Sequence, residues 1–153
     1  MKLDFILDTT KIGDSEMQHL DFAYAASLIR TFMGDPSLIL TIRGRKRTTD
    51  FEFYVGKQLI KVLGVQTEVD AGYEGKEQVV LIEAKNLGAD NVIIRQLYYP
   101  FKQWKNHTKK KIITLFFNKD HIQNIYSIWQ FEFTNIDDYN SIKLVKSGKF
   151  KIK

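Results

Sequence analysis

Two carboxylates and a lysine lie close enough in this sequence to share one site. Asp70 comes near the end of one predicted strand, and Glu83 and Lys85 close the next, which we expect over residues 77–85. Because side chains alternate across a strand, Glu83 and Lys85 point to one face while Ala84 points to the other. Two carboxylates and a backbone carbonyl form a hard-oxygen site that suits Mg²⁺. The lysine beside them could orient or deprotonate a nucleophilic water.

These residues resemble the signature of the PD-(D/E)XK nuclease superfamily. Asp70 matches its first acid and Glu83-Ala84-Lys85 its E-x-K half, while Val69 precedes Asp70 where the motif has proline. The strings Q-T-E-V-D-A-G-Y-E, L-I-E-A-K-N and I-I-R-Q-L-Y-Y-P look like the catalytic domain of certain type II restriction endonucleases. The resemblance covers residues 16–103. It implies a Mg²⁺-dependent DNA endonuclease of restriction type, on an α/β (α+β) fold with a central mixed β-sheet flanked by helices.

The resemblance also implies further site residues. Several such nucleases carry a glutamine on the helix after the lysine, which makes Gln96 a catalytic candidate. Many carry an additional acid near the metal on their first helix, so Glu16 is a candidate ligand and Asp21 is the other option. Glu68 lies on the same face as Asp70 by alternation, so either can be the ligand, and the spacing of the superfamily favours Asp70.

Hydrophobic periodicity and turn residues predict the elements that would position this site. Ser15 opens a predicted helix over residues 16–33, which Gly34 and Pro36 stop. A second helix, bent near Pro100, is expected over residues 94–104. The predicted strands cover residues 38–42, 51–55, 59–63, 68–70, 77–85, 111–118 and 125–133, and Lys146-Ser147-Gly148-Lys149 is predicted to be a hairpin turn.

Positive charge is clustered, although the net charge is only +5. Residues 91–119 contain seven basic side chains and no acid, and the last thirteen residues contain five lysines and no acid. Such clusters suit a polyanion that is bound partly through counterion release. The side chains that we expect to bind DNA are Arg43, Arg45, Lys46, Arg47, Arg95 and Lys102. The lysines near the end of the chain fit a solvated surface equally well.

Length and composition limit the alternatives. The 153 residues suit a single domain, here the nuclease domain itself and, we expect, the catalytic part of a longer protein. The absence of cysteine excludes disulfides, zinc ribbons and thiol catalysis. No apolar run approaches a membrane span, and Asp4 and Asp8 interrupt any secretory signal, so we expect a cytoplasmic protein without a membrane partner.

Two other functions fit the same residues. One is a repair or junction nuclease of the same fold, and the other is a non-catalytic DNA-binding domain derived from it. The sequence has no Walker loop, no G-x-S-x-G and no G-x-G-x-x-G, and its three histidines are not spaced as a metal triad. The expected partner is double-stranded DNA, with a homodimer and a separate DNA-recognition domain left open.

Overall fold

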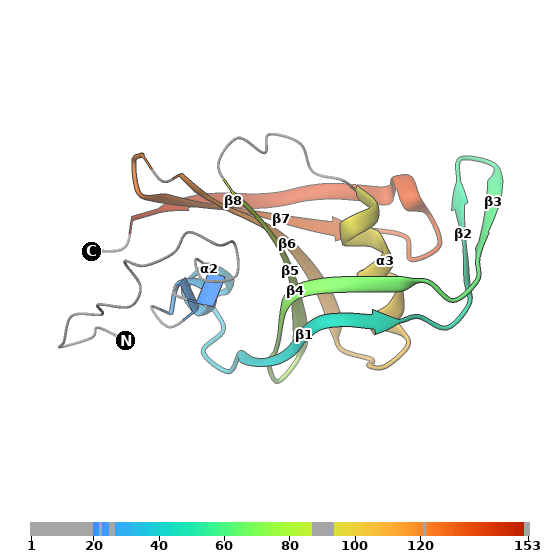
Figure 1. The fold of residues 1–153 in the computed structure, drawn as a ribbon, viewed down its shortest axis with the longest axis horizontal. Coiled ribbons are helices and arrows are strands. Elements are labelled where there is room, and N and C mark those ends of the chain that lie inside the picture. The colour runs from blue at the N-terminus through green and yellow to red at the C-terminus, as the bar shows by residue number, and fades with distance from the viewer. Residues whose placement is uncertain (1–19, 22, 25–26, 87–93, 121, 152–153) are drawn as a thin grey trace.

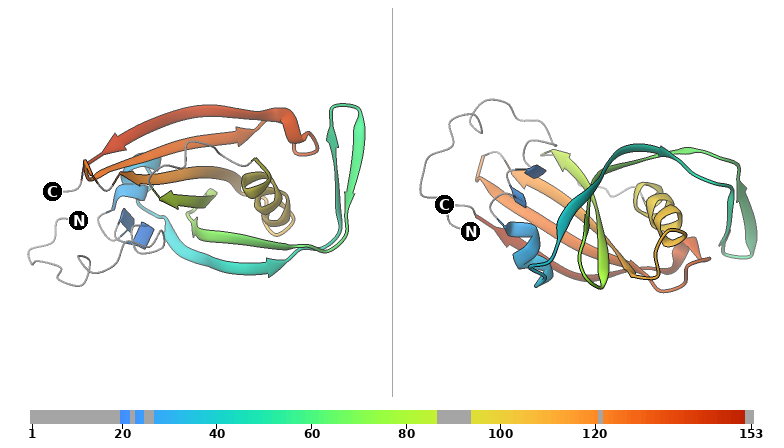
Figure 2. Two further views of the ribbon diagram at one scale, coloured as in Figure 1. Left: turned by 45° about the horizontal axis from the view of Figure 1, so that its top comes forward. Right: turned by 90° about the horizontal axis from the view of Figure 1, so that it is seen from below.

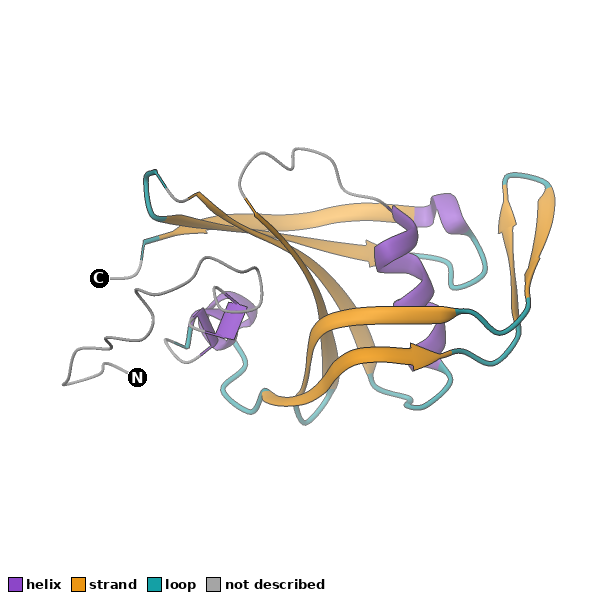
Figure 3. Cartoon of the chain, in the orientation of Figure 1, coloured by secondary structure: helices purple, strands orange, loops and turns teal. Residues whose placement is uncertain are grey.

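The protein is built on a strongly twisted β-sheet (Figures 1 and 3). The computed structural model describes residues 20–151, apart from 22, 25–26, 87–93 and 121. The strands of this sheet are β1 (Ile39–Arg47), β4 (Gln66–Glu74), β5 (Gln78–Asn86), β6 (Lys111–Asp120), β7 (Ile125–Phe133) and β8 (Ile142–Phe150). The remaining elements are helices α2 (Leu28–Met33) and α3 (Ile94–Lys105), the hairpin of β2 (Phe51–Val55) and β3 (Gln58–Val62), and a 3-10 turn, η2 (Tyr139–Ser141).

The six strands are mixed in direction. Their order is β1-β4-β5-β6-β7-β8, and β5 and β6 are parallel while the other neighbours are antiparallel. A parallel pair needs a crossover, and α3 provides it between the ends of β5 and β6. The prediction of a central mixed sheet with flanking helices is therefore confirmed, and β4 and β5 lie inside the sheet.

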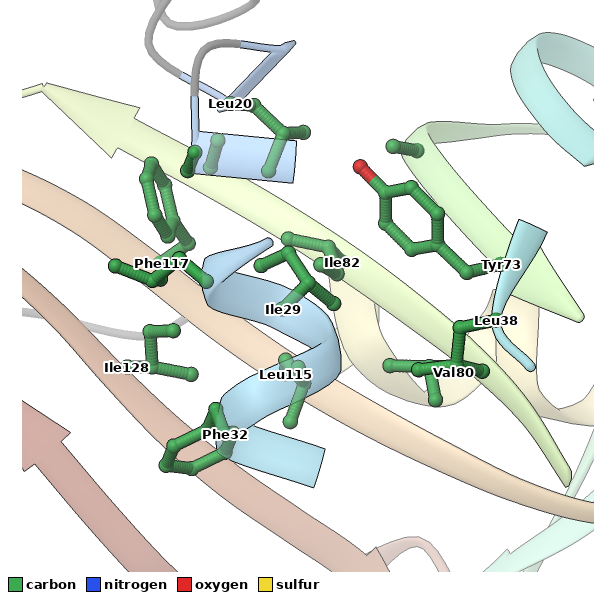
Figure 4. Close-up of a cluster of buried hydrophobic side chains, with 14 of the residues drawn as sticks. Leu20, Ile29, Phe32, Leu38, Tyr73, Val80, Ile82, Leu115, Phe117 and Ile128 are labelled. Carbon is green, nitrogen blue, oxygen red and sulfur yellow. The ribbon is translucent and has the colours of Figure 1, made fainter. Parts of the chain in front are cut away.

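Both faces of the sheet are packed, by different helices. On one face, Ile29 and Phe32 of α2 pack with Val80, Ile82 and other buried side chains (Figure 4). On the other face, α3 buries Leu97, Tyr98 and Phe101 against the sheet. Figure 2 shows the two helices at different ends of the sheet, and α3 packs against β4, β5 and β6. A strand covered on both faces carries apolar residues on both, as β5 does.

The predicted helix over residues 16–33 is not continuous. Leu20, Asp21, Ala23 and Tyr24 are helical, but Ser27 has a φ of 62° and α2 starts only after it. The N–H of Ser27 donates to the carbonyl of Tyr24, which closes a turn between the two parts. The predicted stop is confirmed, because Gly34 ends α2 with a φ of 63° and its N–H donates to carbonyls of the last turn.

The β2–β3 hairpin stands at one end of the molecule (Figure 1). Its strands match those predicted over residues 51–55 and 59–63, and they are joined by a turn at Gly56-Lys57. Its inner face reaches α3 through aromatic rings, since the Phe53 ring centroid lies 5.1 Å from that of Tyr98 and Phe51 lies 5.1 Å from Tyr99. Contacts of this edge-to-face kind add to simple burial, so the hairpin braces one side of α3.

The predicted hairpin turn at residues 146–149 is wrong, because β8 runs through it without interruption. Position 148 has no room for a side chain, because a Cβ on Gly148 would lie 2.9 Å from the ring of Phe150. The other predicted strands and the second helix are present, several of them extended by a few residues. Within the described residues, no helix is long and apolar enough to cross a membrane.

Candidate functional site

A β-bulge in β4 sets the direction of the Asp70 side chain. Gly72 pairs with Ile42 of β1, and Val69 pairs with Gly44. Over this interval β4 advances three residues and β1 only two, so β4 carries one extra residue around Asp70. A bulge of this kind turns side chains away from strict alternation and is frequent beside functional sites.

The burial of neighbouring residues shows the change of face. Before the bulge, Thr67 bonds to Gln103 of α3 and Val69 packs in the cluster beneath that helix. After it, Ala71 and Tyr73 pack in the cluster on the opposite face. In a regular strand these two residues would share the face of Thr67 and Val69, because all four have odd numbers. The simple alternation that we used to place Glu68 beside Asp70 therefore does not hold across this segment.

The two halves of the predicted motif meet directly. An oxygen of the Asp70 carboxylate accepts a hydrogen bond of 2.7 Å from the backbone N–H of Ala84. On either side of Ala84, the Lys85 Nζ lies 3.1 Å from the Glu83 Oε1. Glu83 is only 9% exposed, so its carboxylate is largely removed from water. The structure thus brings Asp70, Glu83 and Lys85 together at adjacent strands.

Burial and charge shift the proton affinity of Glu83. Desolvation is the largest cause and raises the pKa of Glu83, and the neighbouring Asp70 carboxylate raises it further. The Lys85 ammonium opposes both, which leaves the pKa of Glu83 at about 7. Two carboxyl groups this close repel when both are ionised, and a cation between them relieves that repulsion.

A cleft of about 340 Å³ opens over these residues. It lies between β4, the end of β5 and the first turns of α3. The side chains that line it are mostly polar, and they are Gln66, Thr67, Glu68, Asp70, Glu83, Lys85, Arg95, Gln96, Tyr99 and Pro100. A cleft lined by convergent polar groups that include a carboxyl with a shifted pKa is the usual form of a functional site.

Arg95 and Gln96 reach the cleft from the start of α3. The Gln96 side chain carries a buried Oε1 for which the described residues offer no hydrogen-bond donor. Arg95 is exposed, and its guanidinium lies 5.8 Å from the centre of the Tyr99 ring, which holds it over the cleft wall. Tyr99 is half-buried and also lines the cleft. An unpaired acceptor and a cation at a helix N-terminus suit a hydrated phosphate.

The basic cluster of β1 divides into paired and exposed cations. Arg43 donates two hydrogen bonds to the carboxylate of Asp21, at 2.5 Å and 3.1 Å. Arg45 has a looser ion pair of 3.6 Å with Glu68, in which both side chains are more than half exposed. Lys46 lies 5.2 Å from the centre of the Trp104 ring, and Arg47 is exposed. The pairing of β1 with β4 is irregular between Ile42 and Gly44, the interval that contains Arg43.

Lys102 was predicted to bind DNA, and the structure places it outside the cleft. Lys102 is 8% exposed, and its Nζ lies 3.0 Å from the Asp137 carboxylate on the segment before η2. It holds that segment to α3 and is not available to a phosphate. Glu16 falls outside the described residues. Asp21 is the other candidate acid from the first helix, and both of its carboxylate oxygens accept hydrogen bonds from Arg43.

The donor set that remains fits a small divalent cation. Within the described part of the chain, no group of three or more His, Cys, Asp and Glu side chains is placed to hold a metal ion. Asp70 and Glu83 supply two carboxylates, and Mg²⁺ commonly takes only one or two from a protein while it keeps several waters. Glu68 lies at the rim of the cleft, where it faces Arg45.

Together, fold and site define an α+β domain whose central sheet presents an acidic pair and a lysine in a polar cleft. The chain belongs to the family described as a domain of unknown function, DUF6997, whose profile matches residues 1–151. No curated protein and no solved structure matches it.

Proposed function

We propose that this domain is a Mg²⁺-dependent endonuclease that hydrolyses phosphodiester bonds in DNA. The observation that carries the proposal is the meeting of Asp70, Glu83 and Lys85 on the floor of a polar cleft. Arg95 and Gln96 border the same cleft. The restriction type comes from the resemblance of the sequence, and a repair or junction nuclease would use the same residues on a different form of DNA.

Asp70 and Glu83 would hold the metal. Burial and the nearby Asp70 carboxylate both raise the pKa of Glu83, and a cation bound by both carboxylates would favour the ionised form. When bound, Mg²⁺ would offset negative charge on the scissile phosphate and lower the pKa of a coordinated water. The bond between Asp70 and the N–H of Ala84 fixes one carboxylate in advance, which limits the reorganisation on binding.

Lys85 and Gln96 would act on the nucleophile and the phosphate. The Lys85 ammonium is held beside Glu83, from where it can donate to a phosphate oxygen or to the attacking water. The Gln96 amide borders the same cleft, from where it could bond to that water and so orient it. Arg95, exposed at the start of α3, can contact an adjacent phosphate of the same strand. Each role uses a donor or an acceptor that is already in place.

The exposed basic residues of β1 would bind the DNA backbone outside the cleft. Arg45 and Arg47 are exposed at the end of β1, beside the β4 residues that line the cleft. Their charge favours any duplex irrespective of sequence, because phosphate contacts position DNA and base contacts specify it. Arg43 is left out of this surface, since its guanidinium is taken by Asp21.

The test is a cleavage assay on supercoiled plasmid and on end-labelled duplex. The wild type should cut in Mg²⁺, and should bind without cutting in Ca²⁺ and in EDTA. Glu83→Gln and Lys85→Ala should each abolish cutting while their folding, followed by circular dichroism, stays intact. Glu52→Gln, on the distant hairpin, removes the same charge as a matched control and should cut at the wild-type rate. Binding without cutting by the wild type in Mg²⁺ would favour the non-catalytic DNA-binding domain.

A further inference from the structure

The floor of the candidate site continues across the sheet as two rows of side chains. In one row, strand pairing aligns Lys85 with Asn118, Ser127 and Lys149. In the other, it aligns Glu83 with Phe116, Trp129 and Ser147. Residues that pair directly across neighbouring strands share a face, so both rows lie on the side of the sheet that carries the cleft.

This part of the face is open in the described structure. α3 packs against β4, β5 and β6 at one end of the sheet, and the half of β8 that ends at Phe150 extends away from it (Figures 1 and 2). Ser147 and Lys149 are exposed, and Trp129 and Ser127 are half-buried. Trp129 packs beside its cross-strand neighbour Phe116, with ring centroids 5.5 Å apart, so one part of the indole is fixed by this contact.

Two cations, Lys85 and Lys149, lie in these rows, and Lys149 is the one beyond the candidate site. Lys143 and Lys146 of β8 belong to the opposite face, where Lys143 pairs with Glu132 and the Lys146 Nζ donates to the carbonyl of Phe32 in α2. Beyond the candidate site, the next β6 residue on this face after Asn118 is an acid, Asp120. One of its carboxylate oxygens accepts hydrogen bonds from the backbone N–H groups of Ile122 and Gln123. It therefore caps the turn after β6, and the open rows themselves carry no acid beyond Glu83.

We infer that the rows around Trp129 and Lys149 bind an unpaired strand of DNA that continues from the candidate site. Neighbouring strands lie about 4.8 Å apart, so Trp129 is roughly 10 Å from Glu83 and Lys149 roughly 15 Å from Lys85, within reach of the adjoining nucleotides. An aromatic face and flanking cations are the features that bind single strands without sequence preference. A base stacked inside a duplex presents only its edges, so only an unpaired base can lie on the Trp129 ring.

This inference rests on the proposed function for the choice of DNA and for the strand that enters the cleft. It adds the form of the substrate: duplex that gives way to a single strand beside the scissile bond. Such a substrate fits a repair or junction nuclease better than cleavage inside an intact duplex, because the bases of an intact duplex are stacked on each other and not free to stack on Trp129.

Intrinsic fluorescence can test the inference without cleavage. The chain has two tryptophans, Trp104 and Trp129, so Trp104→Phe leaves Trp129 as the only reporter. In EDTA, an oligothymidine of about 12 nucleotides should quench this emission, and blunt duplex at the same concentration should quench it much less. In the converse variant Trp129→Phe, the emission of Trp104 should not respond to the oligonucleotide. If Trp104→Phe does not fold, the comparison of the wild type with Trp129→Phe supplies the same answer.

Affinity measurements complete the test. Trp129→Ala should weaken binding of the labelled oligonucleotide by about fivefold or more, as the loss of one stacked base requires. Lys149→Ala should reduce the slope of log affinity against log salt by about 0.7. Lys143 is exposed on the same strand but pairs with Glu132 on the opposite face, and Lys143→Ala should leave the slope unchanged.

The outcomes separate this inference from the proposed function. Cleavage in Mg²⁺ without any response of Trp129 to bound oligonucleotide would overturn the inference and keep the nuclease. Quenching of Trp129 in a protein that never cuts would keep the binding surface and overturn the nuclease. Equal losses for Lys143→Ala and Lys149→Ala would also overturn the inference, because binding would then follow net charge and not this face.

Discussion

The carboxylate of Asp70 accepts a hydrogen bond of 2.7 Å from the backbone N–H of Ala84, the residue that separates Glu83 from Lys85. This bond joins two strands at the point where their regular pairing, which starts at Ala71 and Ile82, has not yet begun. It takes the place of a main-chain bond and holds Asp70 against β5. The position of Asp70 is therefore determined by the sheet itself and not by a mobile loop.

The first prediction separates Asp70 from Glu68. Asp70→Asn should lower the cleavage rate by at least about 100-fold, because even the hydrogen-bond partners of metal ligands cost typically 10- to 100-fold when replaced. Glu68→Gln should leave the rate of the chemical step within a few-fold of wild type, because Glu68 lies at the cleft rim and faces Arg45. Single-turnover cleavage measures both, and the reverse ranking would return the ligand role to Glu68.

The second prediction concerns stability and pH in the absence of metal. The pKa of Glu83 is about 7 in the folded protein, against an ordinary value of 4.5. Between these two pH values the folded state holds more protons than the unfolded state, so the free energy of unfolding should fall as pH rises. The ionisation of Glu83 should lower the free energy of unfolding by about 1 to 3 kcal/mol over this range, and Glu83→Gln should abolish this decrease. Urea unfolding in EDTA across this range measures the effect, and parallel curves for the two proteins would exclude a shifted Glu83.

The third prediction concerns Lys85. Lys85→Ala should lower the cleavage rate of bound DNA by about 10²- to 10⁴-fold, the range that is typical of a lost proton-transfer group. DNA affinity in Ca²⁺ should change much less, because Lys85 is one cation among many. The same variant should raise the pKa of Glu83 further, since the Lys85 ammonium is what lowers it. A loss of affinity as large as the loss of rate would make Lys85 a binding residue.

The fourth prediction distinguishes two arginines of one strand. Arg45→Ala should reduce the salt dependence of duplex binding by about one unit of slope, as expected for one lost phosphate contact. Arg43→Ala should leave that slope unchanged and lower the free energy of unfolding by about 1 kcal/mol, because it breaks a bidentate pair that is partly exposed. Filter binding at several salt concentrations and urea unfolding decide the matter. Equal slopes for Arg43→Ala and Arg45→Ala would show that Arg43 leaves Asp21 when DNA binds.

The fifth prediction concerns Lys102. Lys102→Met keeps the aliphatic stem but removes the ion pair with Asp137, so it should lower the free energy of unfolding by about 1 kcal/mol. DNA affinity and its salt dependence should stay at the wild-type values, because the ammonium is buried beside Asp137. Weaker DNA binding in a fully folded Lys102→Met protein would contradict this placement.

Local patterns predicted most of the fold. The aromatic and β-branched residues from Ile125 to Phe133 predicted β7, and the apolar run before Glu83 predicted β5. The helix broken at Ser27 was missed because its apolar spacing continues through the break. The turn predicted at residues 146–149 failed because glycine between lysines has the composition of a turn, while here it relieves crowding against Phe150.

The candidate site was harder to predict in detail. Asp70, Glu83 and Lys85 could be chosen from residue type and spacing alone. The bulge at Asp70 could not, because it arises from the mismatch between β4 and β1, two strands that are separated in sequence by a hairpin. The pairing of Arg43 with Asp21 and of Lys102 with Asp137 likewise joins distant segments. The sequence therefore shows where the positive charges are, but only the folded structure shows which of them are free of acidic partners and accessible to DNA.

The β2–β3 hairpin is an insertion in topological terms. Arg47 and Gln66 are the last pair of β1 and β4, so residues 48–65 could be replaced by a two-residue turn without changing the order of the sheet. That replacement would nevertheless destabilise α3, because Phe51 and Phe53 pack against Tyr98 and Tyr99 of that helix. The hairpin is thus dispensable for the path of the chain but couples its own stability to the helix that forms one wall of the cleft.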